Sequence, residues 1–284
     1  MTTLGVQPRP APVPGPRLGA DAAVAPGGVR VHDLAKAYER VVGREFVRTH
    51  ALRDVTFDVR PHEFVSIIGP SGCGKSTVLK ILGGLVSPSA GRVEVSGRPV
   101  TGPGPDRATV FQFPGLMPWR TVRDNVTLAL EFAGVDKRER RRRADAYIQL
   151  VGLADFADHH PRELSGGMQQ RVGLARALAV EPNVLLMDEP FGALDAITRT
   201  QMQDELLRIW EQTRKTVIFI THAIEEAILL SDRVIVMGQG TIAHEVVVDL
   251  PRPRSRHDLL SDRRSLDLMR ELEAQLGPSE GEDH

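Results

Sequence analysis

The sequence predicts an α/β fold with a mostly parallel core sheet, an antiparallel β layer and an inserted α-helical subdomain. Continuous apolar runs are typical of parallel strands buried on both faces, and they cover 64–68, 184–187 and 217–220. Val55, Phe57 and Val59 alternate with polar residues, which predicts a strand that is covered on one face. A helical pattern from Thr121 to about Ala157 predicts the insertion.

Composition divides the chain into segments. Residues 1–28 are rich in proline and glycine and predict a disordered arm. The folded domain is expected at 29–250, with the helical insertion at about 121–160. Residues 251–284 then form a C-terminal extension that ends in a short acidic tail.

The charge balance and the single cysteine exclude several classes of protein. The 36 basic and 37 acidic residues give a net charge of -1, so no whole-chain field favours nucleic acid or anionic lipid. Cys73 has no partner for an internal disulfide, and no signal-peptide pattern follows Met1. The apolar runs are far shorter than the roughly 20 residues of a membrane-spanning helix. We therefore expect a cytosolic chain that acts on a membrane only through partners.

A glycine-rich loop follows the first buried run and leads into a helical pattern. It has the spacing G-x-x-x-x-G-K-S and consists of Gly69, Pro70, Ser71, Gly72, Cys73, Gly74, Lys75, Ser76 and Thr77. Such a loop surrounds a phosphate with backbone N–H groups, and the helix N-terminus adds partial positive charge. Lys75 is expected to reach the β- and γ-phosphates, and Ser76 to ligate Mg²⁺. A chance glycine-rich turn is the alternative.

Two carboxylates end the second buried run, in the sequence Asp188-Glu189-Pro190. Ligands bind at the carboxyl ends of parallel strands, and adjacent strand residues point in opposite directions. Asp188 is therefore expected to face the metal held by Ser76. Glu189 is expected to orient or deprotonate a water beyond the γ-phosphate. An acidic strand terminus without a function is the alternative.

A second glycine pair begins a helix in the stretch Leu164-Ser165-Gly166-Gly167-Met168-Gln169-Gln170-Arg171. Ser165 is a good N-cap, so a capped helix with glycines for close packing is one interpretation. The other is a second anion site, because Gly166 and Gly167 expose backbone N–H groups at the helix start. One nucleotide can use both anion sites only where two chains meet. This interpretation predicts a dimer that encloses two ATP molecules.

Six ordered elements over about residues 29–250 together resemble the nucleotide-binding subunit of ABC transporters, a cassette of the P-loop NTPase class. They are the phosphate loop, Gln112 in 110–112, the stretch 164–171, the stretch 185–189, Ala193-Leu194-Asp195 and Thr221-His222. The resemblance implies ATP and Mg²⁺ as cofactors, ATP hydrolysis as the reaction and a second copy of the cassette as partner.

The resemblance also implies roles for single residues. Gln112 is expected to contact Mg²⁺ and the attacking water and to signal to the membrane subunit. Asp195 is expected to reach across the dimer, and His222 to hydrogen-bond the γ-phosphate. Without the other elements, His222 would be interpreted as a core histidine after a strand. The helix start with Ser165, Gly166, Gly167 and Gln169 is expected to contact the partner's nucleotide.

Two positions depart from the family pattern. Tyr38 resembles the aromatic residue that stacks on adenine, but the connection 39–50 is longer than usual and contains Phe46, which competes for that role. His62 stands where glycine is usual.

The subfamily follows from two further stretches. Residues 116–126, with Pro118 and Trp119, resemble the segment of nitrate, sulfonate and taurine importers that receives a helix of the permease, and 250–254 resemble their tail. This resemblance implies separate transmembrane permease subunits, an extracytoplasmic solute-binding protein and a peripheral position on the cytoplasmic face of a bacterial cell membrane. No nucleic-acid partner is expected, and the cargo is left open.

Two other functions remain as alternatives. One is a soluble ABC ATPase that acts on nucleic acid or ribosomes, although such proteins usually carry two cassettes or long coiled coils. The other is an unrelated P-loop kinase, which would have no use for the stretch 164–171.

Overall fold

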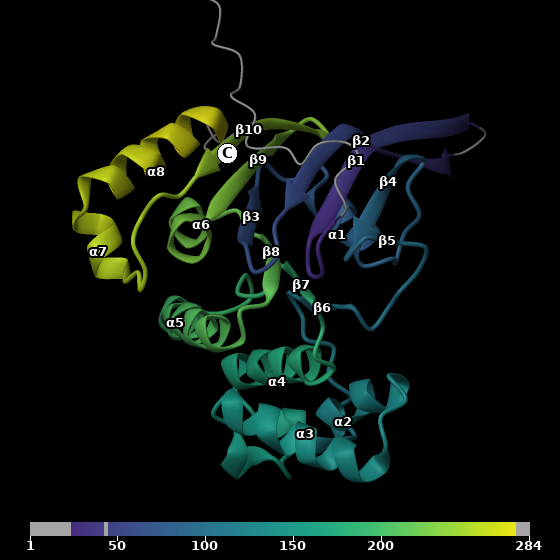
Figure 1. Cartoon of the computed structure of the whole chain (residues 1–284), viewed down its shortest axis with the longest axis vertical. Helices are drawn as coiled ribbons and strands as arrows, with labels where there is room; N and C mark the ends of the chain where they lie inside the picture. The colour runs from purple at the N-terminus through teal and green to yellow at the C-terminus, as the bar shows by residue number, and fades with distance from the viewer. Residues whose placement is uncertain (1–23, 43–44, 277–284) are drawn as a thin grey trace, which may run out of the picture.

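Two β-sheets face each other across a shared apolar layer, and helices cover the outer face of the larger sheet (Figure 1). The computed structural model describes residues 24–42 and 45–276, so most of the predicted arm and the acidic tail lie outside the described residues. The strands are β1 Val29–Val42, β2 Glu45–Val59, β3 Phe64–Ile68, β4 Ala90–Val95, β5 Arg98–Pro99, β6 Arg107–Phe111, β7 Val184–Asp188, β8 Thr216–Ile220, β9 Arg233–Gly238 and β10 Thr241–Val247.

The smaller sheet has the order β2-β1-β4-β5 and is antiparallel throughout. The core sheet has the order β10-β9-β3-β8-β7-β6, and only its edge pair β10-β9 is antiparallel. The predicted mostly parallel core and antiparallel layer are thus confirmed. The carboxyl ends of β3, β6, β7 and β8 lie along one edge of the core sheet, which is where such sheets bind ligands.

The helices form three groups. The first group packs against the core sheet and consists of α1 Lys75–Leu82, α5 Ala196–Thr213 and α6 Ile224–Leu230. The predicted insertion at about 121–160 contains α2 Val122–Phe132, α3 Lys137–Leu150 and the short 3-10 helix η1 Ala154–Phe156. The short 3-10 helix η2 Pro161–Glu163 and α4 Gly166–Ala179 come after these bounds and pack in the same helical subdomain. The C-terminal pair is α7 Arg256–Ser261 and α8 Arg263–Leu276, which lies beside α6 in Figure 1. Within the described ranges, no helix combines the length and apolar character needed to cross a membrane.

Successive residues of the core strands contribute to two different apolar clusters. On β3, Phe64 and Ile68 belong to the cluster on the helix side, whereas Val65 and Ile67 belong to the cluster beneath the smaller sheet. Strand β8 divides its side chains in the same way. The continuous apolar runs therefore arise because both faces of these strands are covered.

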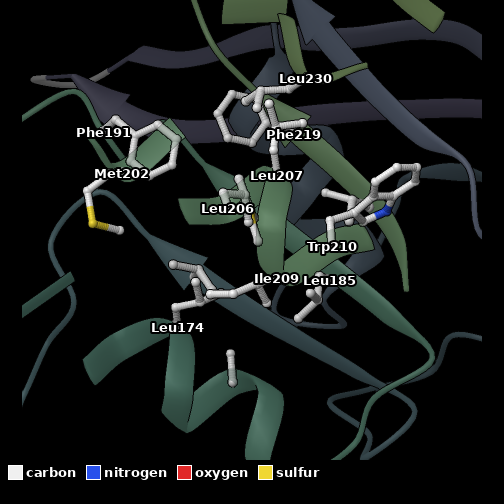
Figure 2. Packing of buried hydrophobic residues seen from close by; sticks show 14 of the residues in the cluster. Leu174, Leu185, Phe191, Met202, Leu206, Leu207, Ile209, Trp210, Phe219 and Leu230 are labelled. Carbon is white, nitrogen blue, oxygen red and sulfur yellow. The ribbon is translucent and has the colours of Figure 1, made fainter. Parts of the chain in front are cut away.

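Aromatic rings fill the helix-side cluster behind the ligand edge (Figure 2). Phe219 on β8 is fully buried, and its ring lies 5.8 Å from those of Phe64 and Phe191. Phe64 in turn contacts Trp210 of α5 edge to face at 5.8 Å. These contacts fix β3 and β8 relative to the loop that follows β7.

Replacing Phe219 with Ala should lower the free energy of unfolding by about 3 to 5 kcal/mol, because the truncation leaves a cavity in a closely packed cluster. Phe46→Ala is the matched control. The Phe46 ring is 84% exposed, so its loss should change the free energy of unfolding by no more than about 0.5 kcal/mol. Urea unfolding of both variants measures the difference. Equal losses would show that Phe219 is not part of a cooperative core.

The backbone at position 62 has a conformation that favours glycine. His62 has φ 65°, in the left-handed region that glycine adopts without steric cost. Its backbone N–H donates to Thr216 Oγ1 at 2.9 Å, and its ring Nδ1 contacts the Arg214 carbonyl. These contacts hold the histidine in the turn between β2 and β3.

Candidate functional site

The glycine-rich loop connects β3 to α1 as predicted, and two of its glycines, Gly69 and Gly74, lie where a side chain has no room. An added Cβ at Gly74, which has φ 106°, would lie 2.5 Å from the Ala51 carbonyl oxygen. At Gly69 it would lie 2.3 Å from the Met237 carbonyl oxygen. The loop is therefore wedged between β2 and the end of β9, and its shape depends on these two glycines.

Lys75 extends along the inside of this loop. Its Nζ donates to the carbonyls of Gly69 at 2.7 Å and Pro70 at 3.0 Å. The side chain is buried, and two of the three ammonium donors are thus occupied by the loop itself. Cys73 is also buried, with its Sγ 3.9 Å from Lys75 Nζ, and packs with the apolar cluster beneath the loop.

A cavity of about 250 Å³ opens above the loop. It brings Glu189 together with residues of β2, the loop and the start of α1. Its lining residues are Ala51, Ser71, Gly72, Gly74, Lys75, Ser76, Thr77 and Glu189. The loop backbone, Lys75 and Glu189 therefore share one space.

Ser76 and Asp188 meet at the edge of this space. Ser76 Oγ donates to Asp188 Oδ1 at 3.0 Å. Burial raises the pKa of the Asp188 carboxyl, and the nearby charge of Glu189 raises it further, whereas the hydrogen bond from Ser76 lowers it. A partly desolvated carboxylate beside a hydroxyl offers the hard oxygen donors that Mg²⁺ prefers. Within the described ranges no group of three or more His, Cys, Asp or Glu could hold a metal ion, so phosphate oxygens would have to complete the set.

Glu189 has a strained backbone and a histidine neighbour. Its φ is 45°, in the left-handed region that is rare for a residue with a side chain. Its N–H donates to Ile220 O and its carbonyl accepts from Gly192 N, both at 3.0 Å, and these bonds hold the conformation. Glu189 Oε2 lies 3.4 Å from His222 Nδ1. Backbone strain of this kind is common at functional sites, so it supports Glu189 as a candidate catalytic residue.

Gln112 follows β6, the neighbour of β7. Phe111 pairs with Asp188, so Gln112 stands one residue beyond that pair at the ligand edge. Its side chain lies against Gly192, where an added Cβ would be 3.0 Å from Gln112 Nε2. Gln112 therefore lies beside the loop that carries Glu189.

The second glycine pair begins α4, with Ser165 as its N-cap. Ser165 Oγ accepts from Met168 N at 3.3 Å, so Ser165 is the N-cap that the sequence predicts, and the cap is compatible with either interpretation of the glycine pair. Gly166 is exposed at this helix start, and Gly167 faces Thr198 of α5, since an added Cβ would lie 2.5 Å from Thr198 Cγ2. The Gln169 amide donates to the carbonyls of Pro161 and Leu164, within its own segment.

Within one chain, this helix start does not join the phosphate cavity. The lining of the cavity includes none of Ser165, Gly166 and Gly167. In Figure 1, α4 lies with α2 and α3 in the lower part of the view, whereas α1 lies among the strands in the upper part. The chain therefore carries two candidate anion sites that it does not bring together.

Asp195 is the N-cap of α5. Its Oδ1 accepts from the backbone N–H groups of Ile197 at 3.1 Å and Thr198 at 3.0 Å. The Thr198 N–H bond is the largest of several hydrogen bonds that lower the pKa of Asp195. One carboxylate oxygen is thus used within the helix start.

Of the two aromatic residues, Tyr38 lies nearer the phosphate loop. Tyr38 pairs with Thr49, two residues before Ala51 of the cavity, whereas Phe46 pairs with Val41 three positions further out along the hairpin. At about 3.4 Å per residue, Phe46 stands about 10 Å further away. Tyr38 is 39% exposed, with Lys36 Nζ 5.1 Å from its ring centroid, and so offers a partly open ring face.

Two residues of α4 that were not predicted as site residues fix the segment after β6. Gln170 is buried and donates to Phe111 O at 3.1 Å. Arg176 donates to Gly115 O at 3.0 Å and also to Pro114 O. Burial lowers the pKa of Arg176. Both residues therefore connect the helix that begins at Ser165 to the segment of Gln112. The sequence signal that could have identified Gln170 is a polar residue on the apolar face of a helix.

Comparisons with known proteins agree with this geometry. A family described as ABC transporter matches residues 52–192. The nitrate import ATP-binding protein NrtD of Synechococcus elongatus is 46% identical over 226 residues, 78% of this chain and 82% of that protein. The taurine import ATP-binding protein TauB of Rhizobium johnstonii is 56% identical over 189 residues, 66% and 72% of the two chains. A dimeric structure of the ATP-binding cassette MJ0796 with ADP and Pi covers 78% of this chain and all of that one, at 36% identity and a TM-score of 0.68.

Proposed function

The chain belongs to the ABC transporter family, and we propose that it is the ATP-hydrolysing subunit of an importer for nitrate, a sulfonate, taurine or a related small solute. One observation carries the proposal. A single cavity joins Lys75, Ser76 and Glu189, while the helix start at Ser165 stands apart from it. Each hydrolysis site is then complete only when a second copy supplies its α4.

Binding starts at the phosphate loop. Backbone N–H groups of the loop and the ammonium of Lys75 hold the β- and γ-phosphates of ATP, and Tyr38 stacks on the adenine. Ser76 and Asp188, with Gln112 beside them, would hold Mg²⁺ together with phosphate oxygens. When bound, this ion neutralises charge that develops on the phosphates.

Closure and hydrolysis follow from the two separate anion sites. The γ-phosphate of the ATP bound to one chain accepts hydrogen bonds from backbone N–H groups at the Ser165 to Gly167 helix start of the other chain. The ATP therefore holds the pair together. Glu189 then orients a water for in-line attack and accepts its proton, and His222 donates to the γ-phosphate. Loss of the γ-phosphate removes the bridge, and the pair opens.

Exposed aromatic side chains near Gln112 support a permease as the partner. Phe113 and Trp119 are 71% and 72% exposed. Trp119 lies on a loop organised by Asn125, which is fully buried and bonds to Met117 through both main-chain groups. A rigid loop that presents a large apolar ring suits the helix of a membrane subunit. On this basis the chain would lie at the cytoplasmic face of the membrane, with a solute-binding protein acting on the opposite side.

The test is phosphate release from Mg·ATP by the full chain at several protein concentrations. We expect the rate per chain to rise with concentration as pairs form. Absence of ATPase activity at every concentration would contradict the proposal. Stimulation by DNA or ribosomal RNA, with no association to membranes that hold the co-expressed permease subunits, would favour the soluble ABC ATPase instead.

A further inference from the structure

The segment that leads into α7 is fixed to the C-terminal end of α6. Arg254 is buried and donates to Ile228 O at 2.8 Å, and Arg252 donates to Leu230 O at 2.7 Å. Arg252 also pairs with Asp232 at 2.8 Å, just beyond α6. Helix α6 starts two residues after His222, so this segment is attached to the helix that directly follows the candidate γ-phosphate histidine.

The next basic residue, Arg256, reaches the other end of α6. Its Nη2 donates to Glu225 Oε2 at 2.7 Å, and its Nη1 donates to Thr200 Oγ1 at 3.3 Å. Glu225 stands three residues after His222, and Thr200 stands five residues after Asp195. One guanidinium thus joins the second turn of α5 to the first turn of α6, the two helices that follow Asp195 and His222.

The two helix starts border an open space. A cavity of about 400 Å³ lies among α5, α6, α7 and α8, and its lining includes His222, Arg256, Leu259 and Met269. Beside the cavity, buried Gln203 of α5 donates to buried Glu226 of α6 at 2.8 Å. Two sets of polar contacts therefore connect α5 and α6 beside this cavity: the Gln203–Glu226 hydrogen bond and, further out, the contacts of Arg256 from the C-terminal segment.

We propose that Arg256 is a positioning residue for ATP hydrolysis. It acts through Glu225 and Thr200, and keeps His222 and Asp195 at the spacing that the closed pair requires. The C-terminal extension then contacts both ends of α6 and fixes the position of the first turn of this helix. This inference rests on the proposed ATPase function.

The test compares the steady-state ATPase kinetics of the full-length variant Arg256→Ala with those of wild type. We expect kcat to fall about two- to fivefold, the range that a half-exposed ion pair supports, while the KM for ATP stays within about twofold. Hydrogen exchange should quicken in 222–227 and remain unchanged in β3 and β7. Arg270→Ala is the matched control, since Arg270 pairs with Asp267 on the exposed face of α8 at 3.3 Å, and it should leave kcat unchanged.

A charge exchange separates positioning from simple stabilisation. The double variant Arg256→Glu with Glu225→Arg should recover more than half of the kcat that Arg256→Ala loses, at an unchanged midpoint of thermal unfolding. Wild-type kcat in Arg256→Ala, or an equal loss in Arg270→Ala, would overturn the proposal. An inactive wild-type chain would instead overturn the proposed function.

Discussion

Glu189→Gln should lower the rate of ATP hydrolysis by about 10²- to 10⁴-fold, because the amide cannot accept the proton of the attacking water. ATP binding should survive, since Lys75 and the loop backbone, which hold the phosphates, are unchanged. Single-turnover phosphate release measures the loss, and equilibrium binding of a fluorescent ATP analogue measures the retained affinity. The variant should therefore accumulate as an ATP-bound pair.

Glu181→Gln is the matched control for this variant. Glu181 also has a left-handed φ, 54°, but it lies on the surface and pairs with Arg143 at 3.1 Å. Its replacement tests whether loss of a carboxylate in a strained turn is harmful by itself. Hydrolysis by Glu189→Gln at a rate near that of wild type would remove Glu189 from the proposed chemistry.

Lys75→Ala should weaken ATP binding by about 100-fold or more, because a buried ammonium that faces the phosphates is lost from a partly enclosed site. The effect differs in kind from that of Glu189→Gln, since affinity falls together with turnover. Lys137→Ala, on the exposed surface of α3, is the control and should bind as wild type does. Unchanged ATP affinity in Lys75→Ala would mean that the loop does not take the phosphates.

The core of the fold was predictable because its strands are short apolar runs that two clusters bury from opposite sides. The phosphate loop was predictable for a related reason: a Cβ added at Gly69 or Gly74 would collide with a carbonyl oxygen of another strand, so these positions require glycine. The C-terminal helices had no such pattern. Their position depends on Arg254 donating to carbonyls of α6, which no local spacing reveals.

The charged residues of the candidate site could be proposed from the sequence. The residues that hold the surrounding segments in place were harder to identify. Asp188, Glu189 and Lys75 belong to short motifs that display their candidate roles. Gln170 connects α4 to the end of the strand before Gln112, and its place on the apolar face of a helix is a weak signal that the structure turns into a specific contact. The choice of Tyr38 over Phe46 likewise required the hairpin register.

Mixing two inactive variants tests most directly whether each site is shared between chains. Lys75→Ala removes the phosphate loop's cation. Gly166→Asp places a carboxylate at the exposed start of α4, where it suits the helix dipole but repels a γ-phosphate. With equal amounts, half of the pairs are mixed and each holds one complete site, so turnover should return to at most about a quarter of the wild-type rate. No recovery on mixing, or full activity from a chain shown to be monomeric, would contradict the shared site.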